Sequence, residues 1–346
     1  MKPLKYLFIS SMLFVATSCG NSWLDLEPST SVDTETSIKI LSDVEFTLNG
    51  IYSTMQSSDA YSGRLVYYGD VTGDDMQAVS STKRVANYYR FNFTKDDNPS
   101  SHWSYLYSII QNCNLILMNI DKLVIDEGDK AYRDDLKGEA LAIRGLALFD
   151  LTRIFGYPYL KDDGASLGVP IIEGLSTIDS KPTRNTVAQC YTKIIDDLTQ
   201  SLSLLGEKFN KGKINKWGAM VLLSRVYLYK GENANALKMA SDAIIGAEKN
   251  KYALWTNEDY PTAWGEDASA SKPGEVLFEI VNLTTDSPGK ESMGYLNSYD
   301  GYDDMCITCS FYQFLKEDPK DIRLQLLSFD KKYYAYVNKY QPQREE

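Results

Sequence analysis

Histidine is almost absent from this sequence: His102 is the only one among 346 residues. Zinc sites built on histidine and Ser-His-Asp triads need imidazole side chains, so both are excluded unless His102 serves alone. We interpret His102, in the first turn of a predicted helix, as a helix-end residue because it has no partner histidine. Beyond the N-terminus, no segment reaches the roughly 18–20 consecutive apolar residues that a membrane-spanning helix requires.

Basic residues are also in short supply. The chain carries 36 lysines and arginines against 47 aspartates and glutamates, which gives a formal net charge of −11. Nucleic acids and anionic membrane surfaces attract proteins with clustered lysine and arginine. The charge balance therefore argues against nucleic acid as a partner and against electrostatic docking on lipid.

The N-terminus has the pattern of an exported protein. Lys2 and Lys5 precede an apolar run over residues 6–16, which is too short to span a bilayer but suits a secretory signal. The sequence ATSC, ending at Cys19, is similar to a bacterial lipobox, in which cysteine becomes the lipidated first residue of the mature protein. We predict a signal peptide over residues 1–18 and lipidation of Cys19, with ordinary secretion as the alternative. The mature chain would carry 34 basic and 47 acidic side chains, a net charge of −13.

Apolar residues at spacings of three and four predict a mainly helical protein. The predicted helices cover residues 42–55, 100–120, 137–156 and 186–206. The first and last open with a capping-box spacing, Ser42 with Glu45 and Thr186 with Gln189.

The predicted helix over 137–156 is apolar on nearly all sides and should be buried between other helices. It nevertheless contains Glu139, Arg144, Asp150 and Arg153. Unpaired charges in such a helix would destabilise the fold, so we expect a network of ion pairs around it.

A ladder of small residues follows. Ser224, Tyr227, Gly231, Ala236, Ala240 and Ala243 are separated by 3, 4, 5, 4 and 3 residues. This spacing, with a glycine at the turn, resembles the helical hairpin of a tetratricopeptide repeat, in which small side chains let two helices approach closely. Residues 137–156 and 186–206 can be interpreted as a second hairpin with an expanded turn.

Three segments lack a helical period and are expected to form long loops: 57–98, 252–274 and 282–305. Between the last two, residues 275–281 alternate as a strand does. The pair Cys306 and Cys309 has the C-x-x-C spacing, which we interpret as two buried thiols or a local disulfide.

Together these motifs resemble the SusD/RagB family of surface lipoproteins. The resemblance is carried by Cys19 with "WLDLEP", by "GEALAIRGLALFDLTRIFG", by "INKWGAMVLLSRVYLYKGENANAL", and by "EVLFEI" and "DIRL". It implies a tetratricopeptide-like helical scaffold with irregular ligand-binding loops and a few short strands. It also implies a lipid anchor in the outer membrane facing the cell exterior, and a SusC-like TonB-dependent transporter as partner. Family members usually continue with another helical segment, so residues 19–346 are expected to be one SusD-like domain that lacks it.

Loop aromatics are the candidate ligand contacts. A flat ring covers the apolar face of a sugar, and nearby polar groups bond to its hydroxyls. Among 25 tyrosines and five tryptophans, we select as ligand-binding candidates Trp264, Tyr295, Tyr299, Asp300 and Tyr302.

No catalytic group or cofactor is predicted. Asp74-Asp75 and Asp303-Asp304 are adjacent pairs, and neighbouring residues do not place two carboxylates across a glycosidic bond. Calcium at Asp300, Asp303 and Asp304 is a lesser possibility, because the spacing lacks the EF-hand pattern. The predicted function is non-catalytic oligosaccharide capture and delivery to the transporter. The alternatives are RagB-like peptide uptake, a glycan hydrolase and a protein-interaction scaffold.

Overall fold

The computed structural model describes residues 37–94, 99–177, 179–207, 212–264, 274–282, 288–330, 332 and 334–340. The chain divides into two units, Met1–Lys39 and Ile40–Glu346. Residues 37–39 are the described part of the first unit. Cys19 and the predicted signal peptide lie outside the described residues, as does Glu346. All the elements that follow belong to the second unit.

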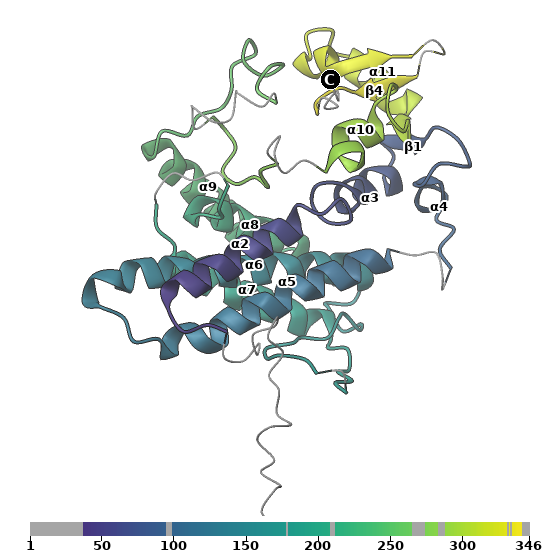
Figure 1. Cartoon of the computed structure of the whole chain (residues 1–346). Helices are drawn as coiled ribbons and strands as arrows, with labels where there is room; N and C mark the ends of the chain where they lie inside the picture. Colours follow the sequence, from purple (N-terminus) through teal and green to yellow (C-terminus); the bar gives the residue numbers. More distant parts are fainter. Residues whose placement is uncertain are drawn as a thin grey trace, which may run out of the picture. The chain divides into compact units, whose positions relative to one another are not determined.

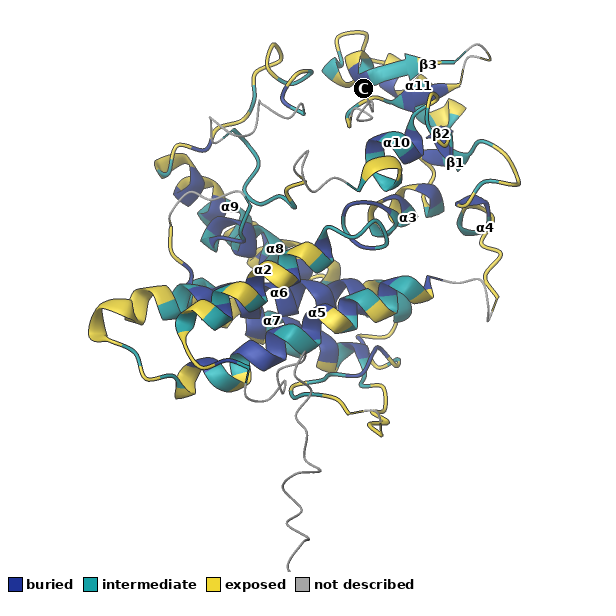
Figure 2. Cartoon of the chain, viewed as in Figure 1, coloured by how far each residue is buried: buried dark blue, intermediate teal, exposed yellow. Residues whose placement is uncertain are grey.

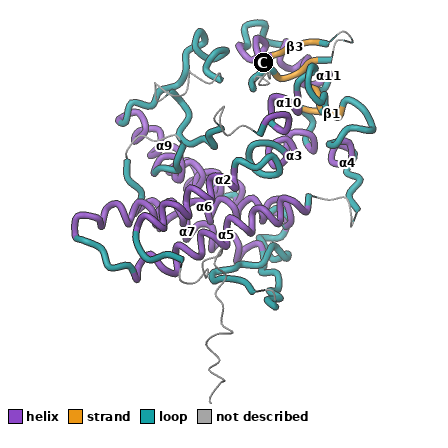
Figure 3. The backbone as a smooth tube through the Cα atoms, viewed as in Figure 1, coloured by secondary structure: helices purple, strands orange, loops and turns teal. Residues whose placement is uncertain are grey.

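Six long helices form the scaffold, and each packs on the next along the chain. They are α2 (Leu41–Met55), α5 (Ser100–Asn119), α6 (Lys130–Phe155), α7 (Val187–Leu204), α8 (Lys216–Lys230) and α9 (Asn233–Lys249). Figures 1 and 3 show these helices side by side, and the strands in the described part of the chain are short. The prediction of a mainly helical protein is confirmed. Within the described residues, no helix combines the length and apolarity needed to cross a membrane.

Helix α6 is the centre of this array. Almost every residue from Leu136 to Thr152 is buried, and Figure 2 shows it as a dark band between its neighbours. Gly138 and Gly145 permit the close approach of α7, because an added Cβ would lie 2.9 Å from Leu205 Cγ and 3.1 Å from Leu198 Cγ respectively. A helix with neighbours on several sides cannot show a single apolar stripe, which explains its sequence.

Helices α8 and α9 form the predicted hairpin. Gly231 ends α8 with φ of +84°, a left-handed conformation that glycine adopts without steric cost. The Ser224 hydroxyl donates to the Ala236 carbonyl oxygen at 2.8 Å, and the ring of Trp217 lies against Gly246. The tetratricopeptide-like interpretation of this segment is confirmed.

The two predicted helix starts had different outcomes. Thr186 caps α7, and its hydroxyl accepts from the Gln189 backbone N–H while the Gln189 side chain accepts from the Thr186 N–H. The prediction for Ser42 was wrong: α2 begins at Leu41, and the Asp43 carboxylate accepts from the Ile40 N–H at 3.0 Å. Ile40 is thus the N-cap residue, and Asp43, the third residue of the helix, takes the role predicted for Glu45.

The prediction that residues 57–98 are irregular throughout was also wrong. They contain α3 (Arg64–Thr72), β1 (Met76–Ala78) and α4 (Ala86–Tyr89). These elements are too short for a helical period to emerge from the sequence. They belong to a second hydrophobic core, whose buried residues are Tyr67, Val71, Met76, Val85, Leu296, Met305, Ile307 and Ala335.

This second core joins two parts of the chain that are far apart in sequence. β1 pairs antiparallel with β2 (Met305–Ile307), with Met76 opposite Ile307, and β3 (Leu327–Phe329) pairs with β4 (Ala335–Val337). The helices of this region are α10 (Met293–Asn297) and α11 (Cys309–Lys316). Short 3₁₀ segments are η3 (Ile120–Lys122), η4 (Glu127–Asp129), η5 (Tyr159–Lys161), η7 (Gly289–Glu291) and η8 (Ile322–Leu326).

The strand predicted over 275–281 is not present. Side chains rather than a neighbouring strand bond its carbonyl groups: Asn215 Nδ2 donates to the Leu277 oxygen at 2.7 Å, and Gln56 Nε2 donates to the Val281 oxygen. Residues 274–280 are all partly buried, so the alternation in sequence corresponds neither to strand pairing nor to alternating burial.

Candidate functional site

The segment 292–304 is a tight loop built on α10. The Ser292 hydroxyl accepts from the Tyr295 N–H and starts the helix, and the Tyr302 N–H then donates back to the Tyr295 carbonyl oxygen at 2.9 Å. Gly301 is required here, because a Cβ would lie 1.9 Å from the Tyr295 carbonyl oxygen. Asp303 adopts φ of +54°, and its N–H donates to Ser298. These contacts hold the loop's side chains in defined positions.

Four of the five predicted ligand-binding residues lie on this loop: Tyr295, Tyr299, Asp300 and Tyr302. The rings of Tyr295 and Tyr302 meet edge to face with centroids 5.2 Å apart. Tyr299 and Tyr302 are 43% and 36% exposed, and Asp300 is exposed between them. We call these four residues the tyrosine cluster. It offers two accessible rings and a carboxylate on one short segment.

Residues from other elements support the tyrosine cluster. Tyr336 of β4 lies 6.2 Å from Tyr299, measured between ring centroids, and its hydroxyl donates to Asp303 Oδ1 at 2.6 Å. The Arg84 guanidinium carbon lies 3.9 Å from the centroid of the Tyr302 ring, a cation–π contact. Lys83 Nζ donates to the Tyr302 carbonyl oxygen at 2.6 Å.

Asp304 lies beneath this surface. It is 2% exposed, and burial raises the pKa of its carboxyl group, while the positive charge of Arg84 opposes that rise. Arg84 Nε lies 3.6 Å from Asp304 Oδ2. Asp304 is therefore a buried partner of Arg84 and does not reach the surface as Asp300 does.

Trp264, the fifth predicted residue, lies in a different aromatic group. Its ring meets Trp255 at 5.0 Å, Tyr260 at 5.6 Å and Tyr340 at 6.3 Å between centroids. Lys339 Nζ lies 3.5 Å from the centroid of its ring. Burial lowers the pKa of the Lys339 amine. We call these five residues the tryptophan cluster; in it Trp264 is surrounded by other side chains.

One segment reaches both clusters. Tyr336 contacts the tyrosine cluster and Tyr340, four residues later, contacts Trp264. Four residues of extended chain span at most about 14 Å. No pattern in the sequence indicates this relationship, because it depends on where the β3–β4 hairpin places residues 336–340.

A cavity of about 660 Å³ lies elsewhere, between α3, α6, α8 and residues 275–278. Its walls are mostly apolar, and include Leu65, Val66, Leu146, Ile154, Val221, Leu222 and Phe278. The polar lining residues include Tyr61, whose hydroxyl donates to Asp150 Oδ2 at 2.8 Å, and Arg153, which pairs with Asp150. None of the five predicted ligand-binding residues lines it.

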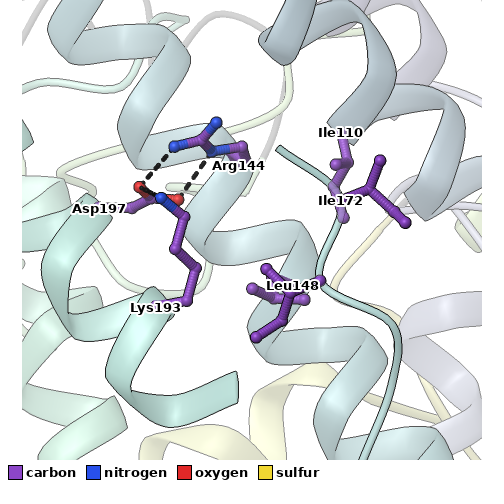
Figure 4. Close-up of a pocket in the computed structure, with 7 residues that line it drawn as sticks. Ile110, Arg144, Leu148, Ile172, Lys193 and Asp197 are labelled. Carbon is purple, nitrogen blue, oxygen red and sulfur yellow. Dashed lines mark hydrogen bonds and ion pairs between the residues drawn. The ribbon is translucent and has the colours of Figure 1, made fainter. Parts of the chain in front are cut away.

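The predicted ion pairs around α6 are present for Arg144, Asp150 and Arg153, whereas Glu139 accepts a hydrogen bond from the Tyr52 hydroxyl instead. Figure 4 shows the pair that Arg144 forms with Asp197. Arg144 donates from Nε and Nη2 to both oxygens of Asp197, at 2.8 and 2.7 Å, and from Nη1 to Asn114 Oδ1 at 2.8 Å. Lys193 Nζ lies 3.2 Å from Asp197. The adjoining cavity of about 10 Å³ has room for about one water molecule, so this cluster is structural.

Two further features of the sequence analysis are His102 and the C-x-x-C pair. His102 is 1% exposed, its Nδ1 lies 3.1 Å from the Asp59 carbonyl oxygen, and burial lowers the pKa of its imidazole. Cys306 is buried and Cys309 is exposed, and both are free thiols. The two alternatives predicted for this pair, a local disulfide and two buried thiols, were therefore both wrong. Among the described residues, no three acidic, cysteine or histidine side chains converge as metal ligands.

The sequence interpretation missed Arg84, Lys83 and Tyr336 as supports of the tyrosine cluster. The Lys83-Arg84 doublet was a visible signal, since basic residues are scarce, but its partners lie more than 200 residues away. Tyr336 gave no signal beyond belonging to a tyrosine-rich end.

Fold and surface together define a class: a helical-repeat protein that carries exposed aromatic side chains on a separate loop region. A family model described as "Starch-binding associating with outer membrane", SusD-like, matches residues 22–228. The chain belongs to the SusD-like family, as the motifs had indicated.

Relatives agree with this assignment. SusD-like protein P2 of Formosa agariphila is 28% identical over 311 residues, which cover 87% of this chain and 57% of that protein. A SusD-like protein of Bacteroides ovatus is 25% identical over 227 residues, which cover 65% of this chain and 39% of that protein. The chain thus spans about half the length of the curated relatives it matches.

Solved structures agree as well. A crystal structure from Bacteroides vulgatus, whose description proposes sugar binding, is 82% identical with a TM-score of 0.87; the match covers 90% of this chain and 70% of that one. A SusD superfamily protein from Bacteroides thetaiotaomicron is 36% identical with a TM-score of 0.79, covering 87% and 70% respectively. The family and the mainly helical fold predicted from the sequence are confirmed.

Proposed function

We propose that this protein captures oligosaccharides at the cell surface without catalysis and delivers them to a SusC-like TonB-dependent transporter. The observation that carries the proposal is the tyrosine cluster, in which Tyr299 and Tyr302 stand exposed on a loop held by Gly301 and Asp303. The glycan-binding character of the family supports it.

The chemistry of the cluster suits a sugar. The rings of Tyr299 and Tyr302 offer apolar faces for the C–H side of a pyranose, while their hydroxyls and the Asp300 carboxylate bond to sugar hydroxyls. Tyr295 packs edge to face with Tyr302 and supports its ring. Trp264 serves as a further contact, within reach of the same hairpin through Tyr340.

Absence of catalysis is part of the proposal. A glycosidase needs two carboxyl groups facing each other across the scissile bond, about 5–9 Å apart. Asp303 is engaged by Tyr336 and by Lys83 Nζ at 3.5 Å, and Asp304 is buried beside Arg84. Asp300 is the exposed carboxylate of this loop, and neither Asp303 nor Asp304 serves as a second carboxyl group facing it.

Calorimetric titration with a panel of neutral oligosaccharides tests the proposal. Tyr302→Ala and Tyr299→Ala should each weaken binding roughly tenfold, which corresponds to about 1.4 kcal/mol of lost stacking. Tyr157→Ala is the matched control, because Tyr157 is 56% exposed and lies outside the cluster. Equal affinity in all three variants, or turnover of any glycan in the panel, would contradict the proposal.

Surface attachment is proposed through Cys19, in the outer membrane and facing outward. Labelled fatty acid should be incorporated into the wild-type protein and not into Cys19→Ser, while both retain glycan affinity. A tagged full-length version, isolated from its native membrane, should co-purify with a TonB-dependent transporter. Recovery without any such transporter would reject that partner.

Peptide capture is a second candidate, favoured by the 660 Å³ cavity. Its apolar walls and the Asp150–Arg153 pair suit an apolar side chain next to a peptide backbone more than a sugar. If peptides are the ligands, Val66→Asp in the cavity wall should abolish peptide binding, whereas Tyr302→Ala should leave it unchanged.

A further inference from the structure

We propose that Glu291 makes the tyrosine cluster selective for uncharged glycans, because its carboxylate occupies an arginine pair that would otherwise hold an anionic group. The inference rests on the proposed glycan capture and adds the charge class of the ligand. Glu291 closes the 3₁₀ segment η7, directly before α10.

Two arginines from different elements converge on this carboxylate. Arg84 Nη1 donates to both Glu291 oxygens, at 3.2 Å to Oε1 and 3.1 Å to Oε2. Arg64 Nη2, from the first turn of α3, lies 3.8 Å from Glu291 Oε2. Two guanidinium groups around one carboxylate form the arrangement with which proteins bind carboxylates, sulfates and phosphates.

This arginine pair borders the proposed sugar contact. The Arg84 guanidinium that binds Glu291 also lies 3.9 Å from the centroid of the Tyr302 ring. An anionic substituent on a sugar stacked at Tyr302 would therefore lie next to Arg84. With Glu291 in place, the guanidinium already has a carboxylate partner and such a substituent meets a negative charge.

The other charges around Tyr302 act in the same direction. Lys83 lies 3.5 Å from Asp303, Arg84 has Asp304 as its second acidic partner, and Arg64 also pairs with Asp59. Asp300 adds an exposed negative charge on the loop. The acidic side chains of this surface therefore neutralise its lysine and arginines and repel anionic ligands.

Exposure makes the hypothesis testable without unfolding the protein. The side chains of Glu291, Arg84 and Arg64 are 39%, 33% and 32% exposed. Ion pairs at such positions contribute little to stability. Glu291→Gln retains the side chain's shape and one acceptor oxygen, so its far-ultraviolet circular dichroism should match wild type and its melting temperature should stay within a few degrees.

The probes are two matched pairs, each a neutral polysaccharide and its carboxymethyl derivative. One pair is built on laminarin and the other on pullulan. Wild-type protein should bind the carboxymethyl form at least tenfold more weakly than the neutral form. In Glu291→Gln, affinity for the carboxymethyl form should rise at least fivefold and fall again with added salt, while neutral binding stays unchanged. Glu317→Gln, which removes an acid at the exposed end of α11, is the control with wild-type selectivity.

The outcomes separate this inference from the proposed function. Equal or tighter wild-type binding of the carboxymethyl form would overturn the role of Glu291 while leaving glycan capture intact. Unchanged selectivity in Glu291→Gln would do the same. If neither neutral nor carboxymethyl polysaccharide of any backbone binds, glycan capture itself fails and the selectivity with it.

Discussion

Arg144 of α6 and Asp197 of α7 form a two-pronged ion pair in the interior, with side chains 8% and 0% exposed. The pair connects two helices whose sequences show no complementary motif. Lys193 and Asn114 complete the hydrogen bonds around it, at 3.2 Å from Asp197 and 2.8 Å from Arg144. Removal of either residue would therefore leave the charge of the other buried without its partner.

Removal of one partner of this pair should destabilise the fold strongly. Asp197→Ala leaves the Arg144 guanidinium without its carboxylate, and breaking a buried pair costs about 3–5 kcal/mol. Urea unfolding followed by circular dichroism measures the effect. Asp242→Ala is the control: it breaks the exposed Lys238–Asp242 pair on α9, which is worth about 0.3–0.5 kcal/mol. Similar losses of unfolding free energy in both variants would show that the buried pair contributes no more to stability than the exposed one.

Two glycine-to-alanine substitutions in helices should have opposite signs. At Gly246 an added Cβ would lie 2.0 Å from the Trp217 ring, so Gly246→Ala should separate α8 from α9 and cost about 1–3 kcal/mol by overpacking. At Gly50 nothing lies within 4 Å, so Gly50→Ala should stabilise α2 by about 0.5–1 kcal/mol through helix propensity. Thermal and urea unfolding compare the two variants. A stabilised Gly246→Ala would contradict the close α8–α9 contact.

Stability should depend on pH through Glu139. This residue is 3% exposed, and burial raises the pKa of its carboxyl group from 4.5 to about 7, although the Tyr52 hydroxyl, which donates to it at 2.7 Å, opposes the rise. Between these two pKa values the folded state binds more protons than the unfolded state. The stability contributed by the neutral carboxyl is therefore present below pH 4.5 and is lost as the pH rises to about 7, by up to about 3 kcal/mol.

Glu139→Gln isolates this contribution, because glutamine stays neutral and still accepts from Tyr52. The difference in unfolding free energy, wild type minus variant, should fall from pH 4.5 to about 7 and then level off. A difference that is constant with pH would mean that Glu139 titrates normally.

Thiol chemistry should distinguish Cys309 from the other cysteines. Cys309 is exposed, whereas Cys113, Cys190 and Cys306 are buried, and burial raises the thiol pKa of Cys306 to about 11 and of Cys113 to about 12. In a Cys19→Ser background at pH 8, Ellman's reagent should label one thiol rapidly, and Cys309→Ser should remove that reaction. The remaining three should react only after unfolding. Rapid labelling of Cys306 would contradict its burial in β2.

Much of the helical scaffold was predictable because amphipathic helices record their burial in their own sequence. Val44, Leu48, Ile51 and Met55 follow one face of α2 and are all buried. The α8–α9 hairpin was predictable for a similar reason, since close helix packing demands small residues at fixed positions. The capping of α7 is also local, because Thr186 and Gln189 lie three residues apart.

The candidate site was predictable only in part. The loop 295–302 could be chosen because four of its residues suit sugar binding and lie close in sequence. Its supports could not, because Arg84, Lys83 and Tyr336 reach it from elements that short-range patterns do not reveal. β1 and β2 are three residues each, and their pairing joins Met76 to Ile307.

By itself the sequence determined the helical array, the expectation of a lipid-anchored N-terminus and the family, since each depends on residues close together along the chain. Tertiary structure alone decided which charges meet. Arg144 with Asp197, Glu139 with Tyr52, and Glu291 with Arg84 and Arg64 are pairs whose members lie on different elements. Electrostatic partners depend on distance in space, which no spacing in the sequence encodes.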